Sequence, residues 1–231
     1  MRSQRFPGKT LHKVNGKPML QYLTERITRC HHVDDIIIAT STDKKDNAVE
    51  EFSAKVGISC YRGSLSNVAS RFKAILEFND FDGFVRINGD SPLLDQALVE
   101  RAVKILMQNR FDLVTNVLVR TYPKGQSVEA LRGDIFRKTF DLMEEEDDLE
   151  HVTKYFYKHK EQFKIHNFEA SEDYSGIQLS VDTVQDMHIF SRMVAAMTRP
   201  PWDYHLGELL HLYQRVQESG RQPSGGFQGG S

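Results

Sequence analysis

The stretch Gly83-Phe-Val-Arg-Ile-Asn-Gly-Asp90 is a short apolar run that ends in Gly-Asp, and residues 95–109 follow it with apolar side chains at helical spacing. This pattern predicts a strand over 83–88 that leads through a turn into an amphipathic helix. The same alternation predicts strands over 35–40, 58–61 and 112–116, and helices over 43–56 and 66–79. A β-α-β-α order with short connections predicts an α/β fold with a mostly parallel sheet covered by helices.

The second half of the chain has a looser pattern. We expect strands over 127–131, 163–169 and 177–181, and helices over 133–143, 149–159 and 184–197. Arg199-Pro-Pro201 interrupts the chain, and Asp203 is the expected N-cap of a last helix with Leu206 and Leu209 on its apolar side. The Gly/Ser-rich residues 219–231 are expected to be a disordered tail. The expected organisation is therefore one domain over 1–218 and a tail over 219–231.

Composition excludes several classes of protein. Apolar residues make up 39% and charged residues 27% of the 231 residues, a mixture typical of soluble globular chains. The net charge of −2 argues against a protein held to nucleic acid mainly by charge, and no apolar run is long enough to cross a membrane. Two cysteines cannot form a disulfide scaffold, and the first residues lack the apolar stretch of a secretion signal. We expect a cytoplasmic protein without a nucleic-acid or membrane partner.

Two aspartates stand where predicted strands end. Asp90 follows a glycine after the strand 83–88, and Asp182 lies between the strand 177–181 and the helix 184–197. Ligands of open α/β sheets bind beyond the carboxyl ends of the strands, and carboxylates there can hold Mg²⁺. The alternatives are local: Asp90 in an Asx-turn, Asp95 as the cap of the next helix, and Asp182 or Thr183 as a helix N-cap.

The N-terminal segment is basic and contains a turn. Arg5-Phe-Pro-Gly-Lys9, preceded by Arg2 and Ser3, combines cations with exposed backbone N–H groups, which suits a polyphosphate. The alternative is a solvated N-terminal loop.

Two further segments could contact a substrate. Thr121-Tyr-Pro-Lys-Gly125 with Glu129 is a substrate loop or only a turn before a strand. His151, in Glu150-His-Val-Thr153, could contact an anion or transfer a proton, or it could be structural. The pair His31-His32 lacks the spacing of a metal site.

The order of these motifs resembles the cytidylyltransferases, and the similarity covers about residues 1–197. The branch that it resembles most is the spore-coat polysaccharide type, which is similar to CMP-Kdo and CMP-acylneuraminate synthetases. The motifs that carry the resemblance are Arg2-Ser-Gln-Arg-Phe-Pro-Gly-Lys9, Gly16-Lys-Pro-Met-Leu20, Ala39-Thr-Ser41, Arg86-Ile-Asn-Gly-Asp90-Ser-Pro92, Thr121-Tyr-Pro-Lys-Gly125, Glu150-His-Val-Thr153 and Val181-Asp-Thr183.

The resemblance implies a doubly wound nucleotidyltransferase sheet of the GT-A-like type, a homodimer, and transfer of CMP from CTP to a sugar acid for surface polysaccharides. It implies that Arg5, Lys9, Asp90 and Asp182 are catalytic and that the two aspartates hold Mg²⁺. The implied nucleotide-binding residues are Arg2, Ser3, Arg5, Lys9, Ala39, Thr40, Arg71 and Asp90. The implied substrate-binding residues are Tyr122, Lys124, Glu129, Glu150 and His151.

The chain also departs from the resemblance. A first strand and an arginine are expected ahead of Met1, so the first strand of the sheet is expected to be missing, and we favour a start assigned too far downstream over a truncation. Ser127 stands in place of an acidic residue, Leu149 in place of an arginine, and Asn67 in place of a common aspartate. The alternatives are a non-catalytic nucleotide-binding member of the family, or a nucleotidyltransferase or glycosyltransferase that uses another nucleotide.

Overall fold

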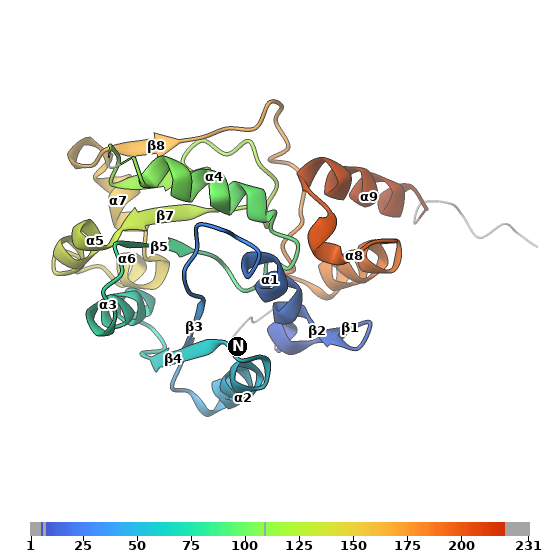
Figure 1. Cartoon of the computed structure of the whole chain (residues 1–231), viewed down its shortest axis with the longest axis horizontal. Coiled ribbons are helices and arrows are strands. Elements are labelled where there is room, and N and C mark those ends of the chain that lie inside the picture. The colour runs from blue at the N-terminus through green and yellow to red at the C-terminus, as the bar shows by residue number, and fades with distance from the viewer. Residues whose placement is uncertain (1–5, 7, 109, 220–231) are drawn as a thin grey trace, which may run out of the picture.

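The computed structural model describes residues 6, 8–108 and 110–219 of the chain (Figure 1). Its six main strands lie where the sequence predicts them, and one further predicted strand, discussed below, is absent. They are β3 (Ile37–Ser41), β4 (Ser59–Gly63), β5 (Gly83–Arg86), β6 (Leu113–Thr115), β7 (Glu129–Arg132) and β8 (Ile165–Asn167). A short hairpin, β1 (Lys13–Val14) and β2 (Lys17–Pro18), precedes them.

Besides the hairpin, the strands form a two-stranded parallel part and a four-stranded mixed part, which are separate sheets by their hydrogen bonds. β3 and β4 pair in parallel, and the other four strands follow the order β5-β7-β6-β8. β7 runs antiparallel to both of its neighbours, whereas β6 and β8 are parallel. Because β7 reverses its direction between them, β5 and β6 also point the same way. The predicted α/β fold is therefore confirmed, with β7 as the antiparallel exception in the four-stranded part.

Helices cover the two faces of this sheet, as expected of a doubly wound fold. The α-helices are α1 (Met19–Ile27), α2 (Asn47–Val56), α3 (Val68–Phe78), α4 (Gln96–Leu106), α5 (Gly133–Phe140), α6 (Glu146–His151), α7 (Lys154–Lys158), α8 (Val184–Ala195) and α9 (Leu206–Ser219). The 3-10 helices are η1 (Lys9–Leu11), η2 (Lys44–Asp46), η3 (Lys160–Gln162) and η4 (Pro201–Asp203).

Alternating residues of the strands build two separate cores. Val114 and Ala130 pack with apolar side chains of α1, α2 and α4. Their neighbours Leu113 and Leu131 pack on the other face with α3, α5 and α7. Successive strand residues point to opposite faces, so a strand that is covered on both faces carries apolar residues on both.

A third core joins the C-terminal helices to the hairpin region. Apolar residues of α8 and α9, including Phe190 and Leu209, pack with Met19 and Tyr22 of α1. Figure 1 shows α8 and α9 together at the end of the molecule away from α5. The apolar faces of α8 and α9 are thus used for packing within the chain.

The buried guanidinium of Arg26 links α1 by hydrogen bonds to residue 94 and to the segment 201–204. Its Nε donates to the Leu94 carbonyl oxygen at 2.7 Å, and Nη2 donates to that of Tyr204 at 2.5 Å. Nη1 donates to the Pro201 carbonyl. Burial lowers the pKa of Arg26 to about 10, with Asp95 acting in the opposite direction, and the side chain stays charged at neutral pH.

Three local predictions were wrong. The expected helix 149–159 is broken at the buried Val152, whose φ of 56° separates α6 from α7. Residues 177–181 form no strand and make only one bridge, between Gln178 and Lys124. Asp203 ends a 3-10 helix and does not cap α9, which starts at Leu206. Each outcome depends on contacts with other segments, which local patterns do not contain.

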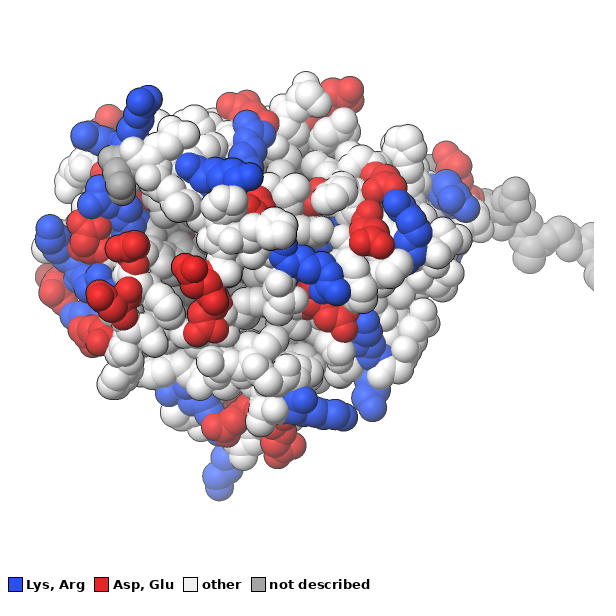
Figure 2. Space-filling model, viewed as in Figure 1, with Lys and Arg blue, Asp and Glu red and all other residues white. Residues whose placement is uncertain are grey.

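None of the helices in the described ranges has the length and apolar character needed to cross a bilayer. On the face seen in Figure 2, Lys and Arg side chains are interspersed with Asp and Glu side chains and form no single basic patch.

Candidate active site

Two aspartates from distant loops share one lysine. The Lys9 Nζ donates to Asp90 Oδ2 at 2.9 Å and to Asp182 Oδ1 at 3.1 Å. The lysine side chain is 11% exposed, whereas the carboxylates are 28% and 30% exposed. The carboxylates can therefore still reach a ligand from solvent, with Lys9 behind them.

A close approach between two loops places Asp182 beside Asp90. The carbonyl oxygen of Lys124 accepts from the N–H groups of Leu179 and Ser180 at 2.8 and 3.0 Å, and Val181 N donates to the Asp90 carbonyl at 2.8 Å. Gly125, at φ 92°, makes this possible: a Cβ there would lie 2.6 Å from the Leu179 carbonyl carbon and would collide with the backbone nitrogen of Ser180.

Side chains around Asp182 orient its carboxylate. Gln178 Nε2 donates to Asp182 Oδ2 at 3.1 Å, and Ser180 Oγ lies 3.4 Å from the same oxygen. The N-cap of α8 is Thr183, which forms a capping box with Asp186. Asp182 is thus not used as the helix cap, whereas Asp95 does cap α4.

The aspartate pair opens into a cavity of about 240 Å³. Its lining is polar and carries both signs of charge. The lining residues are Asn88, Asp90, Ser91, Arg120, Lys124, Gly125, Ser127, Ser180 and Asp182. A wider hollow of about 420 Å³ lies on α9 between Tyr213, Gln214, Gln217 and Glu218, but the only ionisable groups there are a tyrosine and one carboxylate.

The donor set of the site fits magnesium. Mg²⁺ prefers oxygen ligands and is usually held by one or two carboxylates together with water and substrate phosphates. Asp90 and Asp182 supply two carboxylates within reach of one ammonium group. The described residues contain no cluster of three or more His, Cys, Asp or Glu side chains that could hold a metal by themselves. The pair therefore suits an ion that arrives with its phosphate ligands.

Glu129 lies in a buried network at the end of the sheet. Its Oε1 accepts from Thr153 Oγ1 at 2.7 Å and from Tyr157 Oη at 2.6 Å, and its Oε2 pairs with Arg86. The side chain is 4% exposed. Burial, and then the charge of Glu129, raises the pKa of Tyr157, which keeps the phenol protonated. The structure thus places Glu129 against protein groups, and its contact with a substrate stays a prediction.

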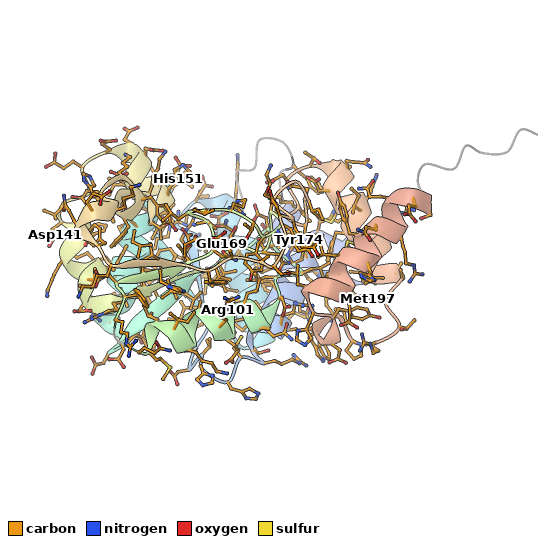
Figure 3. All side chains as sticks on the ribbon, turned by 90° about the horizontal axis from the view of Figure 1, so that it is seen from above. Arg101, Asp141, His151, Glu169, Tyr174 and Met197 are labelled. Atoms are coloured by element: carbon orange, nitrogen blue, oxygen red, sulfur yellow. The ribbon has the colours of Figure 1, made fainter. Side chains whose placement is uncertain are left out.

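The other expected substrate residues lie in different parts of the structure. Lys124 lines the cavity. Tyr122 is buried, and its hydroxyl donates to the Glu169 carbonyl oxygen at 3.2 Å. Glu150 and His151 end α6 at the surface, where His151 Nε2 lies 3.5 Å from Asp147. Figure 3 shows His151 on the opposite side of the molecule from Met197, which follows α8.

The expected nucleoside residues lie near β3. Arg71, in α3, is buried and donates to backbone carbonyls: Nε to Ser64 at 2.7 Å and Nη1 to Ala39 at 3.3 Å. Thr40 Oγ1 donates to Asp46 at 3.0 Å. None of the three lines the cavity, so their contact with a nucleoside stays a prediction. Arg2, Ser3 and Arg5 lie outside the described residues.

Sequence reasoning missed Arg120 and the support for Asp182. Arg120 lines the cavity together with both aspartates. The signal was present, since Arg120 directly precedes the Thr121–Gly125 motif. Gln178 offered no signal, because its role depends on the approach of two loops.

Comparisons with known proteins identify the family. A sequence model of the family described as Cytidylyltransferase matches residues 1–215. An uncharacterized protein of Methanocaldococcus jannaschii is 34% identical over 192 residues, which cover 81% of this chain and 77% of the relative. The spore coat polysaccharide biosynthesis protein SpsF of Bacillus subtilis is 27% identical over 223 residues, 93% of this chain and 91% of the relative.

More distant relatives match part of the chain or its fold. The 8-amino-3,8-dideoxy-manno-octulosonate cytidylyltransferase of Shewanella frigidimarina is 35% identical over 116 residues, 49% of this chain and 47% of the relative. A solved cytidylyltransferase of Leptospira borgpetersenii has a TM-score of 0.85 at 22% identity and covers 95% of this chain and 92% of that one. The CTP complex of CMP:2-keto-3-deoxy-manno-octonic acid synthetase has a TM-score of 0.61 at 18% identity, over 83% and 93%. With the family match over almost the whole described chain and the shared fold, the chain belongs to the cytidylyltransferase family.

Proposed function

We propose that this protein transfers CMP from CTP to a sugar acid, with Mg²⁺ and with release of pyrophosphate, in the synthesis of a surface polysaccharide. The observation that carries the proposal is the Asp90–Lys9–Asp182 arrangement, whose two carboxylates line a polar cavity. A metal–triphosphate complex needs negative groups for the metal and positive groups for the phosphates, and this arrangement contains both.

The reaction is an in-line displacement at phosphorus. A hydroxyl of the acceptor forms a bond to the α-phosphorus of CTP, the bond from that phosphorus to the bridging oxygen breaks, and pyrophosphate leaves with the electron pair. The hydroxyl proton passes to water. Negative charge grows on the leaving phosphates, so cations placed there lower the barrier.

The chain's own residues would bind and orient the triphosphate. Asp90 and Asp182 would hold the Mg²⁺, which supplies charge neutralisation to the phosphates when it is bound. Lys9 bonds to both carboxylates here. We expect its Nζ to turn toward the phosphates once the nucleotide has arrived, because both carboxylates are then occupied. We propose that Arg5 assists Lys9, and that Ala39, Thr40 and Arg71 lie toward the nucleoside.

The acceptor class is proposed from the cavity and from relatives. The Shewanella relative is named for a manno-octulosonate sugar, and SpsF for spore coat polysaccharide. Lys124 lies on the cavity wall and would contact the acid. The cavity is smaller than the about 300–1,000 Å³ typical of ligand pockets, so it suits one part of the reacting pair.

The first test is the thermal stability of the protein with CTP, UTP, GTP or ATP, each with and without Mg²⁺. A nucleotide at about 100 times its Kd stabilises the fold by about 2.7 kcal/mol, and we expect the clear shift only with CTP and Mg²⁺. The second test is pyrophosphate release with a panel of sugar acids. If another nucleotide gives the thermal shift, that nucleotide replaces CTP as the proposed substrate. CTP binding without release selects the non-catalytic alternative.

We further propose that the domain spans residues 1–218 and works as a cytoplasmic homodimer. Light scattering at working concentration gives the mass directly. A mass of 26.6 kDa, that of one chain, contradicts the dimer.

A further inference from the structure

Arg120 is a half-buried cation on the wall of the cavity, and its guanidinium is hydrogen-bonded to one neutral side chain. Its Nη1 donates to Ser127 Oγ at 3.1 Å. In the described part of the chain, no Asp or Glu lies within ion-pair distance of this guanidinium. Its Nε and Nη2 likewise have no acceptor among those residues. One edge of the planar fork is therefore available to a ligand.

The loop that carries Arg120 is firmly built. The buried amide of Asn116 closes it: Nδ2 donates to the Gln126 carbonyl at 2.7 Å, and Oδ1 accepts from Val128 N at 2.9 Å. Thr121, the next residue after Arg120, accepts from Ala170 N at 2.8 Å through its hydroxyl. Its carbonyl accepts from Tyr174 N at 2.7 Å. The guanidinium is thus presented from a loop fixed at both ends.

The cavity lining contains two carboxylates and two cationic side chains. Asp90 and Asp182 are already bridged by Lys9, whereas Arg120 and Lys124 have no carboxylate partner among the described residues. A half-buried guanidinium without a counter-ion favours binding of an anion. A carboxylate matches the fork best, because two parallel N–H groups can donate to its two oxygens.

We propose that Arg120 binds the carboxylate of the acceptor and that Ser127 is the positioning residue that holds the guanidinium toward the cavity. This inference rests on the proposed function, since it names the group that recognises the acid. It makes the acceptor's charge, and not only its shape, the basis of selection. A neutral sugar of the same shape would leave the guanidinium without a counter-ion.

The test adds a competing carboxylate beside Arg120. Ser127→Asp supplies an internal partner, and Ser127→Asn has a similar size without the charge. Arg120→Lys keeps the charge but loses the fork. The probes are 3-deoxy-manno-octulosonate and its carboxamide, each measured for KM in pyrophosphate release and for Kd by calorimetry with CTP and Mg²⁺. Gln214→Glu, on the exposed side of α9, adds the same charge away from the cavity as a control.

We expect Ser127→Asp to raise the KM and Kd for the acid at least tenfold more than Ser127→Asn does, with a change of less than threefold in the KM for CTP. Arg120→Lys should also raise the KM for the acid at least tenfold. The carboxamide should bind more weakly than the acid to the wild type and respond equally to the two Ser127 variants. Equal urea midpoints for these variants exclude unfolding as the cause.

The two ideas fail in different ways. Absence of pyrophosphate release by the wild type contradicts the proposed function, while the calorimetric Kd for the acid still tests Arg120. Equal affinities for the acid in Ser127→Asp and Ser127→Asn overturn the inference, as does a wild type that binds neither probe. Transfer to the carboxamide as efficient as to the acid overturns it as well.

Discussion

Replacing Gly125 with alanine tests whether the site depends on the close approach of two loops. The residue has a φ of 92°, and an added Cβ would meet the Leu179 carbonyl carbon at 2.6 Å and the Ser180 nitrogen even closer. The left-handed backbone costs an alanine about 1–2 kcal/mol. Overpacking against backbone atoms that cannot rotate away adds about 1–3 kcal/mol. We expect Gly125→Ala to lower the free energy of unfolding by about 2–5 kcal/mol in total.

Gly57→Ala provides the matched control. Gly57 ends α2 with a φ of 72°, and an added Cβ there would meet no atom within 4 Å. Alanine at position 57 therefore carries the backbone cost alone, about 1–2 kcal/mol. Urea denaturation of both variants, with the slope m checked for constancy, gives the difference. We also expect Gly125→Ala, but not Gly57→Ala, to weaken the binding of CTP with Mg²⁺, because Asp182 is displaced. Unfolding free energies within about 0.5 kcal/mol of each other would refute the reasoning.

Three further predictions concern individual side chains. Asp90→Asn and Asp182→Asn should each lower turnover at least tenfold at saturating CTP, because a neutral amide binds Mg²⁺ more weakly; wild-type turnover in either variant removes that residue from the metal site. Tyr157→Phe should destabilise the fold by about 1–3 kcal/mol in urea denaturation, because the buried Glu129 loses a donor at 2.6 Å; an unchanged midpoint contradicts this. Burial raises the pKa of Cys30 to about 12, with nearby carboxylates adding to the effect. The unfolded thiol has a pKa of about 8.5, so Cys30 contributes stability below that pH, and the contribution is lost as the pH rises toward 12. Cys30→Ala should therefore flatten the alkaline fall in stability measured by urea denaturation, and an identical fall in both proteins counts against it.

Several parts of the fold follow from local patterns. The run that contains β5 and the helical spacing after Asp95 predict a strand and a capped helix, and both are present. Such elements depend on the periodicity of apolar residues and on capping side chains, which are local properties. α1 was not predicted, and the break at Val152 was missed because a buried β-branched residue with φ 56° is held there by surrounding structure.

Part of the site can also be predicted from local patterns. A carboxylate after a strand end is visible in the sequence, and this pattern is enough to single out Asp90, which follows β5. Asp182 was singled out by the same argument, but the strand expected before it does not form. Their partner Lys9 lies 81 and 173 residues away from them, and sequence periodicity contains no information about contacts of that length. The burial of Glu129 with Thr153 and Tyr157 was hidden for the same reason.

By itself the sequence determined the alternation of strands and helices, the polar strand ends and the order of the motifs, because each of these is set by neighbouring residues. Only the tertiary structure decided that residues 177–181 form a supporting loop in place of a strand, that Lys9 bridges both aspartates, and that Arg120 faces the same cavity. Those outcomes depend on which loops pack together. Packing is determined by the shape and burial of the whole chain and not by any one segment.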